Sequence, residues 1–163
     1  MDTHDKVVFR EISVSNMVPK KIRFYWLIAN ISYVIGGLII ILYWGFVHES
    51  HFLDGAQARF ANINLHGVVY GLVIIDFILS GIPIRIYHGI YSILFGITYG
   101  VFSAIFTVST KRAIYPVLKW HTHPIQALLF CLIALGVILV VQMVFYGLHR
   151  LKRRVRARTM TMP

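Results

Sequence analysis

His66 and Asp76 are the residues best suited to chemistry, because both lie inside a long apolar segment. The sequence has four such segments, each long enough to cross a bilayer: 24–47, 60–82, 89–110 and 124–147. Asp76 is the only Asp, Glu, Lys or Arg within them. A charge near a bilayer centre costs about 2.5 to 3.5 kcal/mol on insertion scales, so an intramembrane ionisable group is a candidate for function.

The two groups share one helical face but are too distant for direct contact. Ten residues separate them, which is about 15 Å along a helix axis. If successive segments cross the membrane in opposite directions, Asp76 lies at the depth of Asn30, Ser32 and Gln142. We therefore expect an inner polar layer in which these side chains hydrogen-bond to Asp76 and hold the helices together.

The same depth count places His66 level with Ser103 and Thr107, and with the thiol of Cys131. These are the serine and threonine hydroxyls that an imidazole at this depth could activate as a general base. A buried histidine can equally be a hydrogen-bonded structural group, and spacing does not decide between the two. The catalytic candidates are His66, Ser103 and Thr107.

The composition predicts the helices that would position these groups. Only 13% of the residues are charged and 58% are hydrophobic, which is typical of a membrane protein. We expect an all-α, polytopic fold: a four-helix transmembrane domain over 24–147, between a polar N-terminal segment, 1–23, and a basic tail, 148–163. The N-terminal segment has no apolar core of the kind found in a cleavable signal peptide.

The distribution of positive charge predicts the orientation. Of the sixteen Lys and Arg residues, twelve lie in the N-terminal segment, the second loop and the tail, and four lie in the first and third loops. This bias predicts that both termini are cytoplasmic, in the plasma membrane or the endoplasmic reticulum. A net charge of +10 distributed in this way indicates anionic lipid headgroups rather than nucleic acid, with a sorting signal or a protein partner as alternatives for the tail. The expected headgroup ligands are Arg150, Lys152, Arg153, Arg154, Arg156 and Arg158.

Small residues form a stripe on the third segment, where they would let helix backbones approach closely. Packing within the chain and a homodimer through the GxxxG of Gly96 and Gly100 both fit it. Gly36 and Gly37 are expected to serve packing in the first segment. The remaining members of the stripe are Ser92, Ser103 and Thr107.

Histidines outside the apolar segments give weaker signals. Two lie in the first loop and two in the third, on the same expected side of the membrane, and together they would make a zinc site only if the loops met. Their spacing is not diagnostic, and we expect neither a metal nor a cofactor. These histidines are His48, His51, His121 and His123.

Several short motifs between residues 33 and 120 together resemble a known family. They are Leu42, Tyr43 and Trp44; Asn64, Leu65 and His66, with Asp76; Pro83, Ile84, Arg85, Ile86, Tyr87 and His88; Tyr91 with the Gly96 to Gly100 region; and Ile114, Tyr115, Pro116, Val117, Leu118, Lys119 and Trp120. Their order resembles the rolling stone family and the related androgen-induced integral membrane proteins, which hydrolyse lipid esters. The block from Ile114 to Trp120 is the most specific.

The resemblance implies two functions. In the hydrolase relatives, the histidine matching His66 works with a threonine on an earlier helix to cleave fatty acid esters of hydroxy fatty acids. This sequence resembles a short form that lacks those first helices. Rolling stone itself is associated with myoblast fusion, which implies a structural role in membrane or cell contact. We expect the structural role, with intramembrane lipid-ester hydrolysis through His66 as the alternative.

Overall fold

Four long helical stretches make up the described part of the chain. The computed structural model describes residues 18–47, 60–61 and 63–160, in which all regular elements are helical. The helices are α2, Lys20–Leu42; α4, Val69–Leu79; α5, Gly89–Thr110; and α6, Pro124–Met160. A π-helical turn, Tyr43–Val47, follows α2, another, Asn64–Val68, precedes α4, and a 3-10 turn, Ile86–His88, precedes α5.

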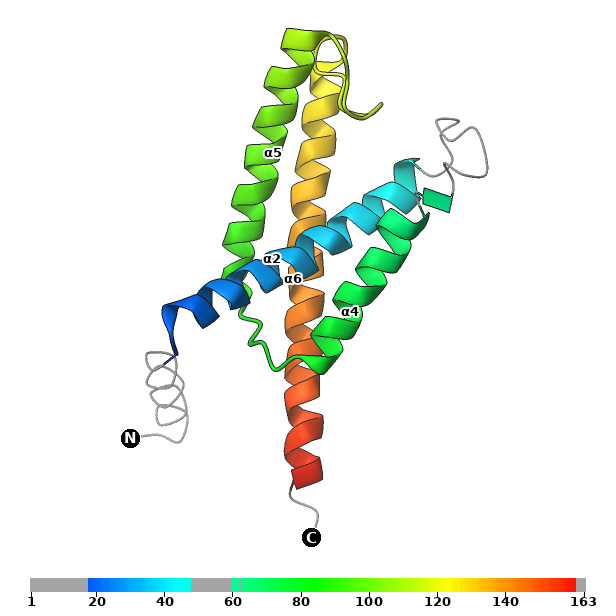
Figure 1. Ribbon diagram of the computed structural model, residues 1–163. Coiled ribbons are helices and arrows are strands. Elements are labelled where there is room, and N and C mark those ends of the chain that lie inside the picture. Colours follow the sequence, from blue (N-terminus) through cyan, green and yellow to red (C-terminus); the bar gives the residue numbers. More distant parts are fainter. Residues whose placement is uncertain (1–17, 48–59, 62, 161–163) are drawn as a thin grey trace.

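Successive helices run in opposite directions (Figure 1). The helices α5 and α6 form an antiparallel pair, and α2 crosses α6 obliquely near its middle, while α4 packs beside α2 and approaches α6 near its own C-terminal end. Three helices are long and apolar enough to span a membrane: Lys20–Gly45, Ile86–Thr110 and Pro124–Ala157. The prediction of an all-helical fold is therefore confirmed for the described residues, and three helices, rather than the expected four, have the length and apolar composition to span a membrane.

The second expected span, 60–82, is shorter than predicted. The apolar helix here covers Asn64–Leu79, and from Ser80 the chain is extended. Pro83 prevents the helix from resuming after this break, because proline disfavours helical geometry at the preceding residue, Ile82. The extended linker still packs inward, since Ile82 and Ile84 are buried in the core.

The last helix is longer than the expected span. Instead of ending at residue 147, α6 continues to Met160 and so includes much of the basic tail. At 1.5 Å per residue its 37 residues extend about 56 Å, well beyond an apolar bilayer core of about 30 Å. The basic residues are therefore carried on a helix that projects past the other three (Figure 1).

Three aromatic rings join α2, α4 and α6. Tyr33 is 1% exposed; its ring meets Phe77 edge-on at 5.5 Å and stacks on Phe145 at 5.7 Å. Phe77 and Phe145 also meet edge-on, at 5.0 Å. Such ring pairs add about 0.5–1.5 kcal/mol to the effect of burial alone. We call Tyr33, Phe77 and Phe145 the aromatic core.

Two glycines let Tyr70 of α4 approach the backbone of α2. A methyl group on Gly36 would lie 2.7 Å from the Tyr70 ring, and one on Gly37 would lie 2.7 Å from the Tyr70 hydroxyl and 2.8 Å from Val141 of α6. The Tyr70 hydroxyl donates a hydrogen bond to the carbonyl oxygen of Tyr33 at 3.3 Å. Gly36 and Gly37 thus serve helix packing, as the sequence indicated.

The small-residue stripe on α5 faces α6 of the same chain. A methyl group on Gly96 would lie 2.9 Å from Ile138 and 3.3 Å from Leu135, and one on Gly100 would lie 3.7 Å from the Cys131 sulfur. Ser92, Ser103 and Thr107 on the same stripe are fully buried. This geometry is the one expected if the stripe serves packing within the chain, which was one of the two alternatives.

We expect Gly36→Ala to lower the thermal stability of the protein in detergent micelles, because the added methyl group overlaps the Tyr70 ring. Overpacking of this kind costs about 1–3 kcal/mol. Gly71→Ala on α4 is the matched control, since a methyl group there meets nothing within 4 Å and alanine favours helix. Tryptophan fluorescence during heating measures both. Equal stability of the two variants would contradict the close seating of Tyr70 on α2.

Candidate functional site

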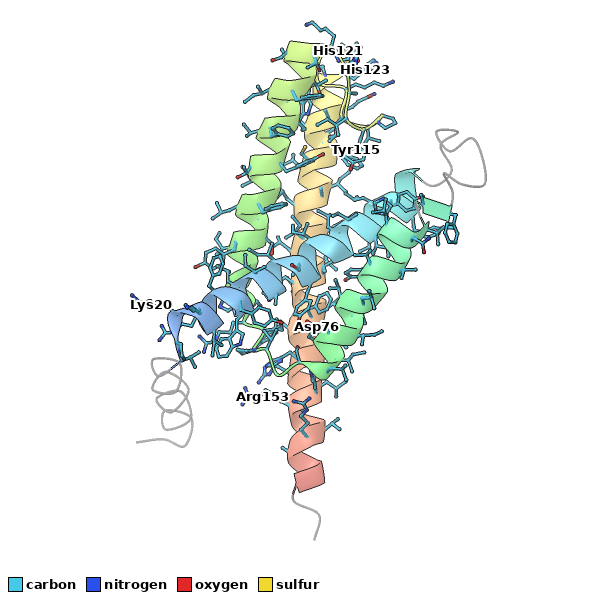
Figure 2. All side chains as sticks on the ribbon, in the orientation of Figure 1. Lys20, Asp76, Tyr115, His121, His123 and Arg153 are labelled. Carbon is cyan, nitrogen blue, oxygen red and sulfur yellow. The ribbon has the colours of Figure 1, made fainter. Side chains whose placement is uncertain are left out.

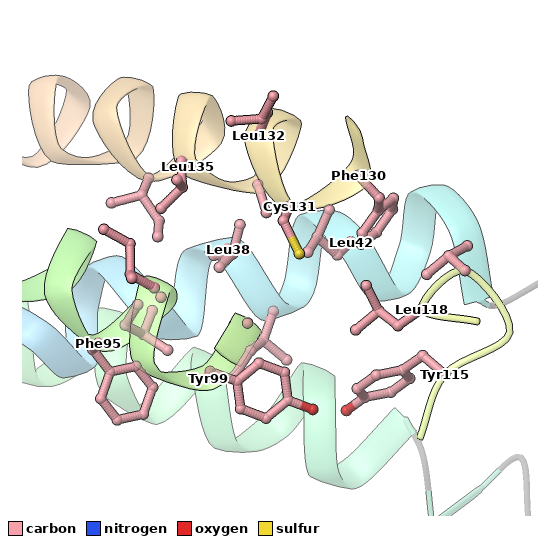
Figure 3. A pocket seen from close by; sticks show the side chains of 18 of the residues that line it. Leu38, Leu42, Phe95, Tyr99, Tyr115, Leu118, Phe130, Cys131, Leu132 and Leu135 are labelled. Atoms are coloured by element: carbon pink, nitrogen blue, oxygen red, sulfur yellow. The ribbon is translucent and has the colours of Figure 1, made fainter. Parts of the chain in front are cut away.

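An apolar cavity lies between α2, α5 and α6, beside the segment that follows α5 (Figure 3). Its volume is about 650 Å³, within the range of about 300–1,000 Å³ usual for small-molecule sites. Apolar side chains such as Leu38, Phe95 and Leu135 form most of its wall. The described polar groups on the wall are the His66 imidazole, the phenols of Tyr43, Tyr99 and Tyr115, the Trp120 indole and the Cys131 thiol.

His66 reaches this cavity from the π-helical turn Asn64–Val68. Its ring stacks on Tyr43, which lies in the π-helical turn after α2, with 4.2 Å between centroids and 21° between planes. π-helical turns are rare and frequently occur at functional sites. Among the described residues, none is hydrogen-bonded to the imidazole, and the stack on Tyr43 covers one face of its ring.

Ser103 is not placed to react with His66. It is fully buried and does not line the cavity; its hydroxyl donates to the Gly100 carbonyl at 2.8 Å and accepts from the Trp120 indole at 3.1 Å. Its contact with Trp120 joins α5 to the segment after it. Within the described residues, the Ser103 hydroxyl is therefore engaged in structural hydrogen bonds.

Thr107 is also fully buried and absent from the cavity wall. Its hydroxyl has no hydrogen-bond partner among the described residues. No hydrogen bond joins either Thr107 or Ser103 to His66, so the structure does not form the expected outer pairing. Equal depth in a bilayer does not fix which way a helical side chain points.

The cavity includes phenols that depth counting missed. Tyr43, which the sequence indicates only as part of a motif, is 5% exposed and covers one face of His66. The hydroxyls of Tyr99 and Tyr115 point toward one another across the cavity wall (Figure 3). Tyr99 lies between Gly96 and Gly100, so its place beside the small-residue stripe was the available signal.

Asp76 has a different partner from those expected. The Tyr33 hydroxyl donates to its carboxyl oxygen at 2.6 Å and also lies 3.4 Å from the Ser80 hydroxyl. Asp76 itself is exposed on the surface of the described bundle, in its lower half (Figure 2). The carboxyl group therefore links α4 to α2 through a tyrosine that the depth count did not include.

The other three members of the expected inner layer form no hydrogen bond with Asp76 in the described structure. Gln142 is 2% exposed, and its side-chain amide donates to the Arg85 carbonyl at 3.0 Å. Asn30 is fully buried, with no hydrogen bond from its side chain to a described residue, while Ser32 is exposed. The prediction that they bind Asp76 is wrong for the described structure, because the helices cross obliquely.

Lys152 points into the bundle rather than only toward headgroups. Its ammonium group donates to the carbonyl of Phe77 at 2.7 Å and to that of Ser80, and lies 5.4 Å from the Phe77 ring centroid. It thereby satisfies carbonyls at the C-terminal end of α4, where a cation is favourable. The other expected headgroup ligands, Arg150, Arg153, Arg154 and Arg156, are exposed, and the side chain of Arg158 lies outside the described part.

The third-loop histidines do not form a metal site with any described group. His121 and His123 are exposed at the upper end of the α5–α6 pair (Figure 2). Over residues 18–47, 60–61 and 63–160 there is no cluster of three or more His, Cys, Asp or Glu side chains. His48 and His51 lie outside the described residues.

Comparisons with known proteins give one consistent family. A family model described as "Protein rolling stone" matches residues 4–162. A curated protein of that name from Drosophila melanogaster is 25% identical over 140 residues, which cover 81% of this chain and 50% of the relative. The chain thus spans about half the length of that relative. No solved structure matches the chain.

The Tyr33–Asp76 contact can be tested by a double-mutant cycle. We expect Asp76→Leu to lower the free energy of unfolding by about 1–3 kcal/mol, because it leaves the buried Tyr33 hydroxyl without its acceptor. Asp76→Asn keeps an acceptor oxygen and should be tolerated. In a Tyr33→Phe background, Asp76→Leu should cost less than in the wild type. Thermal unfolding in micelles measures the four variants, and additive losses would contradict the contact.

Proposed function

The chain belongs to the rolling stone family, and from that premise we propose that it is a multi-pass membrane protein with a structural role in membrane or cell contact, including fusion. One observation carries the non-enzymatic choice. The described wall of the cavity beside His66 presents no serine or threonine hydroxyl, and the imidazole is stacked on Tyr43. An activated nucleophile needs its base within hydrogen-bond reach, and the described wall offers no such alcohol pair.

The membrane arrangement that we propose has four crossings. Three helices have spanning length, and Asn64–Leu79 would be the fourth, extended at its start by the helical residues Phe60, Ala61 and Ile63. Large apolar side chains on all four helices are exposed in the bundle, as expected where lipid covers them. Four crossings put Lys20 and Arg153 on one side, and the positive-inside rule makes that side the cytoplasm.

Intramembrane hydrolysis of lipid esters is the second candidate. The observation in its favour is that His66 lines an apolar cavity of about 650 Å³, large enough to hold part of an acyl chain. His66 would be the general base. In this case a nucleophile would have to come from outside the described cavity wall or from Ser103 or Thr107 after a rearrangement.

The topology predicts which positions react from outside. In a Cys131→Ala background, a cysteine at Lys111 should react with a membrane-impermeant maleimide added to the outer side of sealed membranes. A cysteine at Arg156 should react only after permeabilisation, because α6 ends on the opposite side. Gel-shift labelling measures both. Reaction of the Arg156→Cys protein in sealed membranes would refute the proposed orientation.

Fluorophosphonate labelling separates the two functions. If the role is structural, the purified full chain should show no labelling that depends on His66, so wild type and His66→Ala should give equal signals. His123→Ala is the matched control, because this histidine is exposed and does not line the cavity. Labelling that is lost in His66→Ala and kept in His123→Ala would overturn the structural proposal in favour of hydrolysis.

A further inference from the structure

A second, basic cleft lies at the other end of α2, where Lys20 is found (Figure 2). Its volume is about 390 Å³, and it separates the first turns of α2 from the start of α5. Lys20 and Arg23 line it from α2, and Arg85 and His88 line it from the chain leading into α5. The rest of the wall is formed by Phe24, Trp26, Leu27 and Tyr91.

The charges in this cleft have no acidic counterpart within the described residues. Asp76 is the only Asp or Glu in residues 18–47, 60–61 and 63–160, and its carboxyl group accepts from Tyr33. The Arg23 side chain donates from Nε to the Val18 carbonyl at 3.1 Å, and Arg85 donates to the Tyr87 hydroxyl. A guanidinium has five N–H donors, so each arginine keeps several for a ligand.

The fold holds the Arg85 side of the cleft in position. The Gln142 amide of α6 donates to the Arg85 carbonyl at 3.0 Å, and Ile84 beside it is 2% exposed. Gly89 packs against the same glutamine, since a methyl group there would lie 3.0 Å from its Cγ. Gln142 is thus a positioning residue that holds the backbone of Arg85 at the edge of the cleft.

His88 contributes a further polar side chain to the lining of the cleft. Its Nδ1 is buried and has no hydrogen-bond partner among the described residues. The ring meets Tyr87 edge-on at 4.9 Å and lies 6.4 Å from Tyr91. The α2 side of the cleft therefore presents the two cations Lys20 and Arg23, and the other side presents the Arg85 guanidinium with the imidazole of His88.

We propose that this cleft binds the phosphorylated headgroup of an anionic membrane lipid. Arginine and lysine donors suit phosphate oxygens, and basic pockets between membrane helices on the cytoplasmic side are suited to such headgroups. Phe24 and Leu27 continue the α2 face that carries Lys20 and Arg23, which gives an acyl chain an apolar path beside the headgroup. Trp26 and Tyr91 have the ring types that prefer the headgroup level.

The proposal rests on the membrane embedding proposed above and differs from the tail as a headgroup site. The exposed tail arginines would attract any anionic surface, whereas the cleft would select a compact, multiply charged phosphate. The lipid is preferred to a free phosphate compound because apolar and aromatic side chains form half of the lining.

Binding of dioctanoyl phosphatidylinositol 4-phosphate to the purified full chain in micelles tests the proposal. We expect Arg23→Gln with Arg85→Gln to weaken binding about tenfold or more, because each arginine loses charge-assisted hydrogen bonds to phosphate. Lys111→Gln with Arg112→Gln removes two positive charges from the exposed C-terminal end of α5, at the opposite end of that helix from the cleft, and should change binding about twofold or less. Arg23→Lys with Arg85→Lys should give an intermediate loss, because lysine lacks the guanidinium fork.

Three further measurements separate the possible outcomes: two with other ligands and one of membrane embedding. Dioctanoyl phosphatidylcholine should not compete, and inositol bisphosphate should bind much more weakly than the lipid. Equal losses in the two double-glutamine variants would reduce the effect to general attraction and overturn the proposal, as would equal affinity for inositol bisphosphate. Extraction of membranes with alkaline carbonate tests embedding separately: release of the protein would refute the membrane proposal, whereas retention without cleft-dependent binding would refute only the headgroup site.

Discussion

The contacts that Tyr33 of α2 and Tyr70 of α4 make along residues 33–37 of α2 fix the relative positions of α2, α4 and α6. Tyr33 fills the aromatic core and donates to Asp76, while its carbonyl accepts from Tyr70, whose ring lies on Gly36. In lipid no hydrophobic force presses helices together, so association depends on packing and interhelical hydrogen bonds of this kind. Both candidate sites are built on opposite ends of the helix that this stretch anchors.

The sequence predicted the helices better than it predicted their partners. Apolar length located α5 at its observed bounds, and Pro83 explains why the chain is extended before it. Side-chain pairing could not be predicted from depth, because α2 crosses α6 obliquely and α4 packs mainly beside α2. The π-helical turns add to this, because side chains in them depart from α-helical positions, and both rings of the His66–Tyr43 stack lie in such turns.

The same limits apply to the candidate sites. Apolar segments with an internal His and Asp were visible in the sequence, but a cavity depends on which faces are left unpacked. The basic cleft could not be predicted either, because Arg23 and Arg85 are distant in sequence and are brought together where the chain enters α5. Lys152 was expected at headgroups because of its charge, yet the free carbonyls at the end of α4 accept its hydrogen bonds.

The helix α6 connects the two sites physically. Ile138 lines the apolar cavity and meets Gly96, and Gln142, one turn further along, holds the Arg85 carbonyl at the cleft. Because both side chains are fully or almost fully buried on a single continuous helix, they cannot move independently by large amounts. A displacement of α6 relative to α5 that widens the cavity must therefore also disturb the support of Arg85. The cavity and the cleft are best understood as two ends of one packed unit, in which α2 and α5 line both, and α6 forms a third wall of the cavity and supports the Arg85 side of the cleft.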